Sequence, residues 1–296
     1  MGRGYSTEEI RQKLITSLRD SDTGMSGVEI SGRVGINRLT MTKYLKVFAA
    51  EGLLRQKNIG NVTLWFLEPG QESFSFPDDY FKVAELYLGH LTKCAKDSAY
   101  SVIRNCVHSG ASASRLVLEV VVPASAAVQE MYDAGKIGSA EQGLMGVILS
   151  ESLQILVQLP VVSDAEKNVI VLAADSQSVI LSEAASAAYH GEGWRVWHLG
   201  DMSHAVDVLF DIDFQKLVGR VWRQKPGLLA VVVFSGTYEG LNFFADAVNP
   251  ARKKSGRIKL ILCGKMPKNA GIECDMATGR LEEILQWSKT VSESQD

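Results

Sequence analysis

The chain of 296 residues contains 46% hydrophobic and 22% charged residues, the balance of an ordinary globular protein, and its length favours two or three compact units. No segment approaches the ~18 consecutive apolar residues of a membrane span, so no membrane partner is expected. The polar N-terminus, MGRGYSTEEIRQK, lacks the apolar region of a signal peptide, and we expect a cytoplasmic protein. The four cysteines show no CxxC spacing, which favours free thiols over disulfides or a metal site.

Charge is distributed unevenly along the chain, whose net charge is −3. Residues 1–68 contain 10 Lys and Arg against 7 Asp and Glu, a net charge of +3, whereas the remainder carries −6. A basic N-terminal part on an acidic body is typical of a chain in which only the N-terminal part meets a polyanion.

Three helices and a hairpin are predicted over residues 1–68. Apolar residues at helical spacing predict helices over 8–20, 25–34 and 38–51. Gly35 supplies the positive φ that ends the second helix, and Asn37 caps the third, which buries Leu39, Leu45 and either Val47 or Phe48. The stretch LLRQKNIGNVTLWFLE predicts two short strands joined by a turn at 58–61.

The segment SGVEISGRVGINRLTMTKYLKVFAAEGLLRQ resembles the winged helix-turn-helix domains of many prokaryotic regulators. In such domains the third helix fits the major groove and its first residues reach base edges, so the resemblance implies double-stranded DNA as partner. The residues that would contact bases or phosphates are Arg38, Thr40, Thr42, Lys43 and Lys46 on the helix and Arg55, Lys57 and Asn61 on the hairpin. The alternative is a winged helix that serves protein contacts.

A linker and a long helix follow the hairpin. Residues 69–79 contain prolines, a glycine and several polar residues, which predict a linker. Residues 80–107 carry a wide apolar face that begins at Phe81 and predict one long helix. Two alternatives stay open for this helix: it joins two protomers of a homodimer, or it is one member of a bundle within the chain.

Two further helices complete a predicted helical bundle over 80–162. In the first, over 116–134, Pro123 follows a run of valines and predicts a kink or a break. The second, over 139–159, is apolar almost all round, so we expect it to be buried on several sides. A short glycine-flanked segment at 135–138 predicts a tight connection between them.

Residues 163–296 alternate apolar runs of strand length with helices. The predicted strands are 169–174, 194–200, 228–236 and 258–264, separated by helical segments, with a last helix over 279–291. Fully apolar strands that alternate with helices predict a doubly wound parallel sheet covered on both faces. Such sheets bind ligands at the carboxyl ends of their strands. The fold class expected for the whole chain is therefore multi-domain α/β.

Two segments, VVVPASAAVQEMYDAGKIGSAEQG and VIVLAADSQSVILSEAASAAYHGEGWRVWHLG, resemble the cobalamin-binding module of corrinoid proteins and of light- or cobalamin-responsive repressors. The resemblance covers residues 100–291 and implies a helical bundle on a flavodoxin- or Rossmann-like domain, with a ligand between them. The residues that it implies at the ligand are Tyr132, Glu141, Gln142, Asp175, Gln177, Ser235, Thr237, Cys263 and Gly264.

The chain departs from that family at the positions that ligate cobalt. The family pattern Asp-x-His-x-x-Gly is matched here only by Asp175, and Gln177 stands in place of the histidine. Gln142 likewise replaces a histidine of the helical bundle, and Cys263 replaces a glycine. An amide is a poor metal ligand, so we expect neither ligation of cobalamin by a histidine nor a protein metal site. Base-on cobalamin, another tetrapyrrole, a different small molecule, or no ligand remain as alternatives.

The sequence favours a regulator over an enzyme. It contains no GxGxxG, P-loop, GxSxG or HExxH motif. The leading hypothesis is a dimeric DNA-binding transcriptional regulator that senses a signal through a cobalamin-binding-like module. One alternative is a ligand-free regulator whose C-terminal module serves oligomerisation or partner binding. The other is a corrinoid methyl-transfer protein with an added winged helix.

Overall fold

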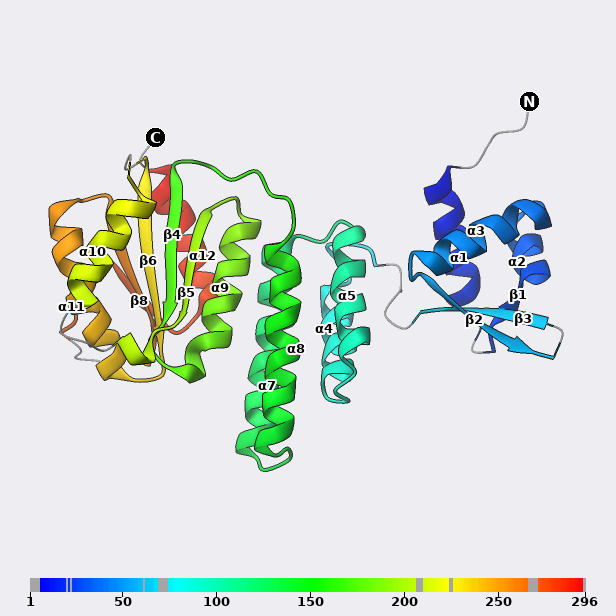
Figure 1. The fold of residues 1–296 in the computed structure, drawn as a ribbon, viewed down its shortest axis with the longest axis horizontal. Helices are drawn as coiled ribbons and strands as arrows, with labels where there is room; N and C mark the ends of the chain where they lie inside the picture. The colour runs from blue at the N-terminus through cyan, green and yellow to red at the C-terminus, as the bar shows by residue number, and fades with distance from the viewer. Residues whose placement is uncertain are drawn as a thin grey trace. The chain divides into compact units, whose positions relative to one another are not determined.

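The computed structural model describes residues 6–19, 21, 23–60, 62–68, 74–205, 210–223, 226–265 and 271–294 (Figure 1). The chain divides into two compact units, Met1–Ala111 and Ser112–Asp296. The boundary falls inside residues 80–162, which the sequence predicts as one bundle. In the described part of the chain, no helix is both long enough and apolar enough to cross a membrane.

The first part of the N-terminal unit packs three helices on a small antiparallel sheet. Its core is built from buried side chains of all three helices, Leu14, Ile30 and Phe48 among them. In the sheet, β3 lies between β1 and β2, and Met25 pairs with Trp65. The elements are α1 (Thr7–Arg19), β1 (Met25–Ser26), α2 (Gly27–Val34), α3 (Arg38–Ala50), β2 (Leu54–Ile59) and β3 (Val62–Leu67).

Local signals in the sequence place the ends of α2 and α3. Gly35 has φ 74° and ends α2, and the Asn37 Oδ1 accepts the Leu39 N–H at 2.9 Å, so both predicted caps are confirmed. Helix α2 begins at Gly27 rather than at residue 25. The Ser26 N–H donates to the Glu29 carboxylate, and the Ser26 hydroxyl accepts the Glu29 N–H. Because this capping box begins the helix after Ser26, Met25 and Ser26 form strand β1 instead.

The buried face of α3 differs from the prediction at one position. Met41, Leu45 and Phe48 are buried, so of the two alternatives Phe48 is the core residue and Val47 is 47% exposed. The prediction that Leu39 is buried is wrong, because its side chain is 77% exposed. Two residues along a helix turn the side chain by about 200°, so Leu39 faces away from the core that Met41 enters.

The predicted single helix over 80–107 is wrong, because the chain forms α4 (Tyr80–Leu91) and α5 (Lys96–His108). Between them the N–H groups of Cys94 and Ala95 donate back to the carbonyls at the end of α4, and Cys94 has a left-handed φ of 52°. Phe81, placed by prediction on the apolar face, is 74% exposed. The buried face of α4 runs through Tyr80 and Tyr87 instead.

The C-terminal unit begins with a helical layer. Its elements are α6 (Ala113–Leu116), the π-helix η1 (Val117–Val121), α7 (Val122–Asp133) and α8 (Ser139–Val157). The helical run continues through Pro123, where the sequence predicts a kink or a break. The π-helical segment places Pro123 in the first turn of α7, where a missing N–H removes no hydrogen bond within that helix. On α8, Leu144 and Val147 are 45% and 52% exposed, so this helix is not buried all round as predicted.

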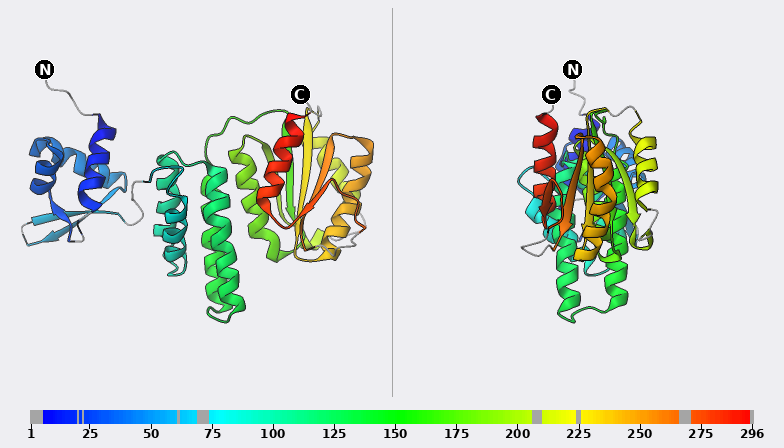
Figure 2. Two further views of the ribbon diagram at one scale, coloured as in Figure 1. Left: turned by 180° about the vertical axis from the view of Figure 1, so that it is seen from behind. Right: turned by 90° about the vertical axis from the view of Figure 1, so that its left-hand side faces the viewer.

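A five-stranded parallel sheet in the order β5-β4-β6-β7-β8 forms the rest of the unit. Figures 1 and 2 show α10 and α11 on one face of this sheet and α9 and α12 on the other. The strands are β4 (Lys167–Ala173), β5 (Arg195–Asp201), β6 (Leu228–Ser235), β7 (Ile258–Gly264) and β8 (Met276–Thr278). The remaining helices are η2 (Ser176–Ser178), α9 (Val179–Gly191), η3 (Ser203–Ala205), α10 (Phe210–Val221), α11 (Tyr238–Lys254) and α12 (Leu281–Glu293).

The doubly wound parallel sheet is confirmed. Strand β6 is buried along its whole length, as its uninterrupted apolar run predicts. Strand β8 was not predicted, because three residues give too short a pattern. The strand order reverses between β4 and β6, and a doubly wound sheet binds ligands in the crevice beside the carboxyl ends at that point. In this unit α7 and α8 pack against α9, whose first turn follows η2 at the carboxyl end of β4.

Candidate functional site

A polar cluster lies where β4 and β6 end. The Asp175 Oδ2 accepts hydrogen bonds from the Ser235 hydroxyl at 2.7 Å and from the Gly236 N–H at 2.7 Å. The other oxygen, Oδ1, accepts the Ser178 N–H at 2.9 Å. The structure therefore brings Asp175 and Ser235 together, two of the residues that the sequence places at the ligand.

The surroundings of Asp175 favour its ionised form. Burial alone raises the pKa of this carboxyl, but the hydrogen bonds from Ser235, Ser178 and Gly236 outweigh it, so the pKa lies below the ordinary value. An ionised carboxylate with three donors has little capacity left for a ligand. Asp175 therefore joins the ends of β4 and β6 through their backbone.

Thr237 and Gly264 hold the same edge of the sheet. The Thr237 side chain accepts the Gly240 N–H at 3.2 Å and caps α11. At Gly264, an added Cβ would lie 2.0 Å from the Ser235 carbonyl oxygen, so only glycine allows these strand ends to approach each other so closely. Helix capping is a common role of Thr at a strand end, whereas the role of Gly264 follows only from the structure.

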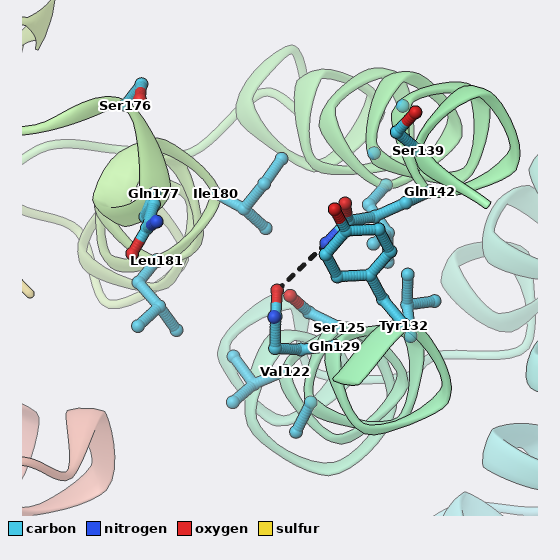
Figure 3. Close-up of a pocket in the computed structure, with 15 residues that line it drawn as sticks. Val122, Ser125, Gln129, Tyr132, Ser139, Gln142, Ser176, Gln177, Ile180 and Leu181 are labelled. Carbon is cyan, nitrogen blue, oxygen red and sulfur yellow. Dashed lines mark hydrogen bonds between the residues drawn. The ribbon is translucent and has the colours of Figure 1, made fainter. Parts of the chain in front are cut away.

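A cleft of about 630 Å³ lies beside this cluster, between α7, α8 and the beginning of α9 (Figure 3). Tyr132 and Gln142 line it from the two helices, and Gln177 lines it from η2. Glu141, which the sequence also places at the ligand, does not line it. The Glu141 carboxylate accepts the Gly138 N–H at 3.0 Å and caps the start of α8.

Two glutamine side chains cross the cleft between α7 and α8. The Gln142 Nε2 donates to the Gln129 Oε1 at 3.0 Å (Figure 3). The Gln129 Nε2 in turn donates to the Asp133 carboxylate at 2.8 Å. Asp133 thus fixes the orientation of the Gln129 amide, and Gln129 fixes that of Gln142. The Gln142 Oε1 and its second N–H are then oriented by the protein before any ligand binds.

Cys263 lines a second cavity, of about 380 Å³, next to the carboxyl ends of β6 and β7. Its side chain is 4% exposed, and burial raises the pKa of the thiol to about 12, so the thiolate does not form near neutral pH. Val122 and Leu181 line both this cavity and the cleft, and these two side chains separate them.

The residues present do not fit protein ligation of cobalt. The described residues that line the cleft include no His, Cys, Asp or Glu, so this lining offers no side chain as an axial ligand for cobalt. Gln142 and Gln177 are the residues that the sequence resemblance sets against histidines of cobalamin-binding modules. His198 forms a hydrogen bond with the Ser182 hydroxyl at 3.0 Å, and His190 forms one with the Leu159 carbonyl at 2.9 Å.

A second candidate site is the exposed face of α3. Of its thirteen residues three are basic and none is acidic, and the sequence-predicted residues all lie at exposed positions, Arg38, Thr40, Thr42, Lys43 and Lys46. No ion pair in the described part of the chain uses these cations. On the hairpin, Arg55 lies 5.3 Å over the Phe66 ring and Lys57 is exposed. Asn61 lies outside the described residues.

Sequence reasoning missed Gln129, Gly143 and Gly146, which line the cleft. Gln129 lies in the segment that resembles cobalamin-binding modules but is not among the residues that the resemblance implies at the ligand, and its spacing from Tyr132 on one helical face was the only signal of it. The two glycines lie three residues apart inside a helix, and this spacing alone does not indicate a binding site.

No protein-family model matches the chain, and no curated protein matches it. A solved structure similar to it is the monomethylamine corrinoid protein of Methanosarcina barkeri, with 12% sequence identity and a TM-score of 0.53 over 71% of this chain and 98% of that chain. The chain shares the fold of a corrinoid protein. The methanol:cobalamin methyltransferase complex of Methanosarcina barkeri matches at 13% identity over 76% of this chain and 84% of that chain, with a TM-score of 0.37 that supports no further conclusion.

This similarity extends to the fold alone. It accounts for a helical layer followed by a parallel sheet, which the sequence predicted from its resemblance to cobalamin-binding modules. The residues of the cleft determine what the fold binds in this chain.

Proposed function

We propose that the chain is a DNA-binding transcriptional regulator whose first 68 residues form a winged helix. The observation that carries this proposal is the exposed face of α3, with three cations, no acid and no ion pair among the described residues. A helix preceded by a glycine turn and followed by a hairpin is the arrangement that places such a face in the major groove.

The proposed contacts divide between bases and phosphates. Thr40 and Lys43, in the first two turns of α3, would reach base edges in the proposed complex, and Arg38 begins the same helix. Arg55 and Lys57 on β2 are placed to contact phosphates. Leu39, exposed in the first turn, offers an apolar contact for a thymine methyl group.

The C-terminal unit is proposed to receive the signal rather than to catalyse a reaction. Its cleft reaches η2, which follows the carboxyl end of β4 next to the point where doubly wound sheets bind ligands, and the polar side chains at the strand ends serve to hold the backbone. A ligand in the cleft would change the placement of two winged helices in a dimer, and so the affinity for paired half-sites. The half-exposed Leu144 and Val147 on α8 provide apolar area for such a dimer.

The experiment that tests the DNA-binding proposal is selection of duplexes from a random library by the full-length protein. We expect enrichment of a defined sequence, and loss of that enrichment in the double variant R38A/K43A. The matched control is Lys136→Ala, which removes an exposed lysine from the loop between α7 and α8. Equal enrichment by the double variant would mean that another surface binds DNA. No enrichment by the wild-type protein would contradict the proposed regulator function.

A second candidate function is a corrinoid methyl-transfer protein, which the fold similarity favours. Against it, Gln177 and Gln142 leave the described residues of the cleft without an imidazole for cobalt. Titration with aquacobalamin separates the two. A corrinoid protein binds it with a change in its visible spectrum, whereas the proposed regulator leaves the spectrum of the cobalt centre unchanged.

A further inference from the structure

The cleft between α7, α8 and α9 is lined by 15 residues, none of which is Asp, Glu, Lys, Arg, His or Cys. In a chain with 22% charged residues, this neutrality restricts the ligand. A charged group that left water for this cleft would lose its hydration and gain no counter-charge, a transfer that costs free energy. The cleft therefore favours an uncharged ligand.

Gly143 and Gly146 shape the α8 wall of the cleft. They lie three residues apart on one face of the helix, and a Cβ added at either would meet nothing within 4 Å. Glycine inside a helix is less stable than alanine, and here no neighbour requires its small size. The two glycines instead leave a flat patch of helix open to the cleft, where side chains would otherwise project.

The side of the cleft that faces α8 contains both aliphatic and polar side chains, and the Gln142 amide crosses the cleft toward it. Val122 on α7 and Ile180 and Leu181 on α9 contribute aliphatic surface facing the cleft (Figure 3). The Gln142 amide is held by Gln129 and keeps an acceptor oxygen and one N–H available. An amide with both functions pairs well with a ligand that has its own amide, lactam or urea group.

We propose that the cleft binds an uncharged ring-shaped organic molecule that stacks on the Gly143–Gly146 patch and hydrogen-bonds to Gln142. No bond from the protein to a metal ion takes part. The proposal names the chemical class of the signal and to that extent rests on the proposed function, but the binding site itself does not depend on DNA binding.

Two dyes with the same ring system test the charge and shape of the site. Nile red is an uncharged benzophenoxazine, and Nile blue is its cationic analogue, so the pair differs mainly in charge. Fluorescence titration of the full-length protein is expected to give saturable binding of Nile red and at least about tenfold weaker binding of Nile blue. Equal affinity for the two dyes, or no saturable binding of Nile red, would overturn the proposal.

Alanine substitutions locate the dye. The double variant G143A/G146A replaces two glycines with the residue that favours a helix most, so its melting temperature should rise. Its affinity for Nile red should fall about tenfold, because the two added methyl groups occupy the flat patch. The matched control is Gly219→Ala inside α10, where an added Cβ also meets nothing within 4 Å. It should raise the melting temperature and leave dye binding unchanged. Unchanged dye affinity in the double variant would contradict the assignment to this cleft.

DNA binding by the same preparations separates the two proposals. If the wild-type protein binds Nile red in the predicted manner but selects no duplex, the proposed DNA-binding function is contradicted and the proposed binding site is supported. If it selects a duplex but binds no dye, the proposal of an uncharged ligand is contradicted and the DNA-binding function is supported.

Discussion

The Gln142 side chain on α8 donates a 3.0 Å hydrogen bond to the Gln129 side chain on α7. Because Asp133 accepts from Gln129 at 2.8 Å, a charge outside the lining of the cleft determines which atom Gln142 offers to a ligand. We predict that Gln129→Ala shifts the side-chain amide signal of Gln142 in an NMR spectrum and lowers the free energy of unfolding by about 0.5 kcal/mol. Gln154→Ala, an exposed substitution later on α8, is the control. A Gln142 signal that does not respond to Gln129→Ala would mean that the two amides are not bonded.

The Asp175 carboxylate makes stability depend on pH in acid. Burial raises the pKa of this carboxyl, but the hydrogen bonds from Ser235, Ser178 and Gly236 lower it by more, so the pKa in the folded state lies below 3.8. The stabilisation is complete at neutral pH and is lost as the pH falls through the folded pKa. Asp175→Asn should lower the free energy of unfolding at pH 7 by about 2 kcal/mol, and the difference from wild type should narrow in strong acid. A pH-independent difference in urea unfolding would contradict this account.

Glu183 on α9 has the opposite effect on stability. Burial raises its pKa above 4.5 although Ser150 donates to it, and its Oε2 has no partner among the described residues. A raised pKa in the folded state means that stability falls as the pH rises through 4.5 and stays lower above the folded pKa. Glu183→Gln should therefore raise the melting temperature at pH 7 and change little at pH 3. A lower melting temperature at pH 7 would show that the ionised carboxylate has a partner.

The ends of β6 and β7 approach each other so closely at Gly264 that no side chain fits there. An added Cβ would lie 2.0 Å from the Ser235 carbonyl oxygen, so Gly264→Ala should lower the free energy of unfolding by about 2–3 kcal/mol. At Gly256, in the loop before β7, an added Cβ meets nothing within 4 Å, and the same substitution should change stability by less than about 0.5 kcal/mol. Equal effects of the two substitutions in urea unfolding would contradict the observed register of β6 and β7.

The predictions that held rest on local chemistry or on long apolar runs. Gly35 and Asn37 act on the backbone next to them, so their roles follow from residue type alone. Strand β6 is predictable because every one of its residues is apolar up to Ser235. These signals do not depend on what packs against them from elsewhere in the chain.

The predictions that failed depend on contacts across the fold. Leu39 is apolar but faces solvent, because the rotation of α3 is set by Met41 and Phe48 in the core. The turn at Cys94 adopts a left-handed backbone that apolar periodicity does not encode. Glu141 was placed at the ligand by family resemblance, and only the structure shows that its carboxylate caps α8.

The central claim is that α3 is the DNA-binding surface, and the salt dependence of binding to the selected duplex tests it most directly. Each phosphate contact by Lys or Arg contributes about −0.9 to the slope of log affinity against log salt concentration. The wild-type protein should give a steep negative slope. K43A/K46A should weaken binding, Lys43 through its lost base contact and Lys46 through a lost phosphate contact that makes the slope about 0.9 less negative. Binding by the double variant with the wild-type slope and affinity would contradict the account.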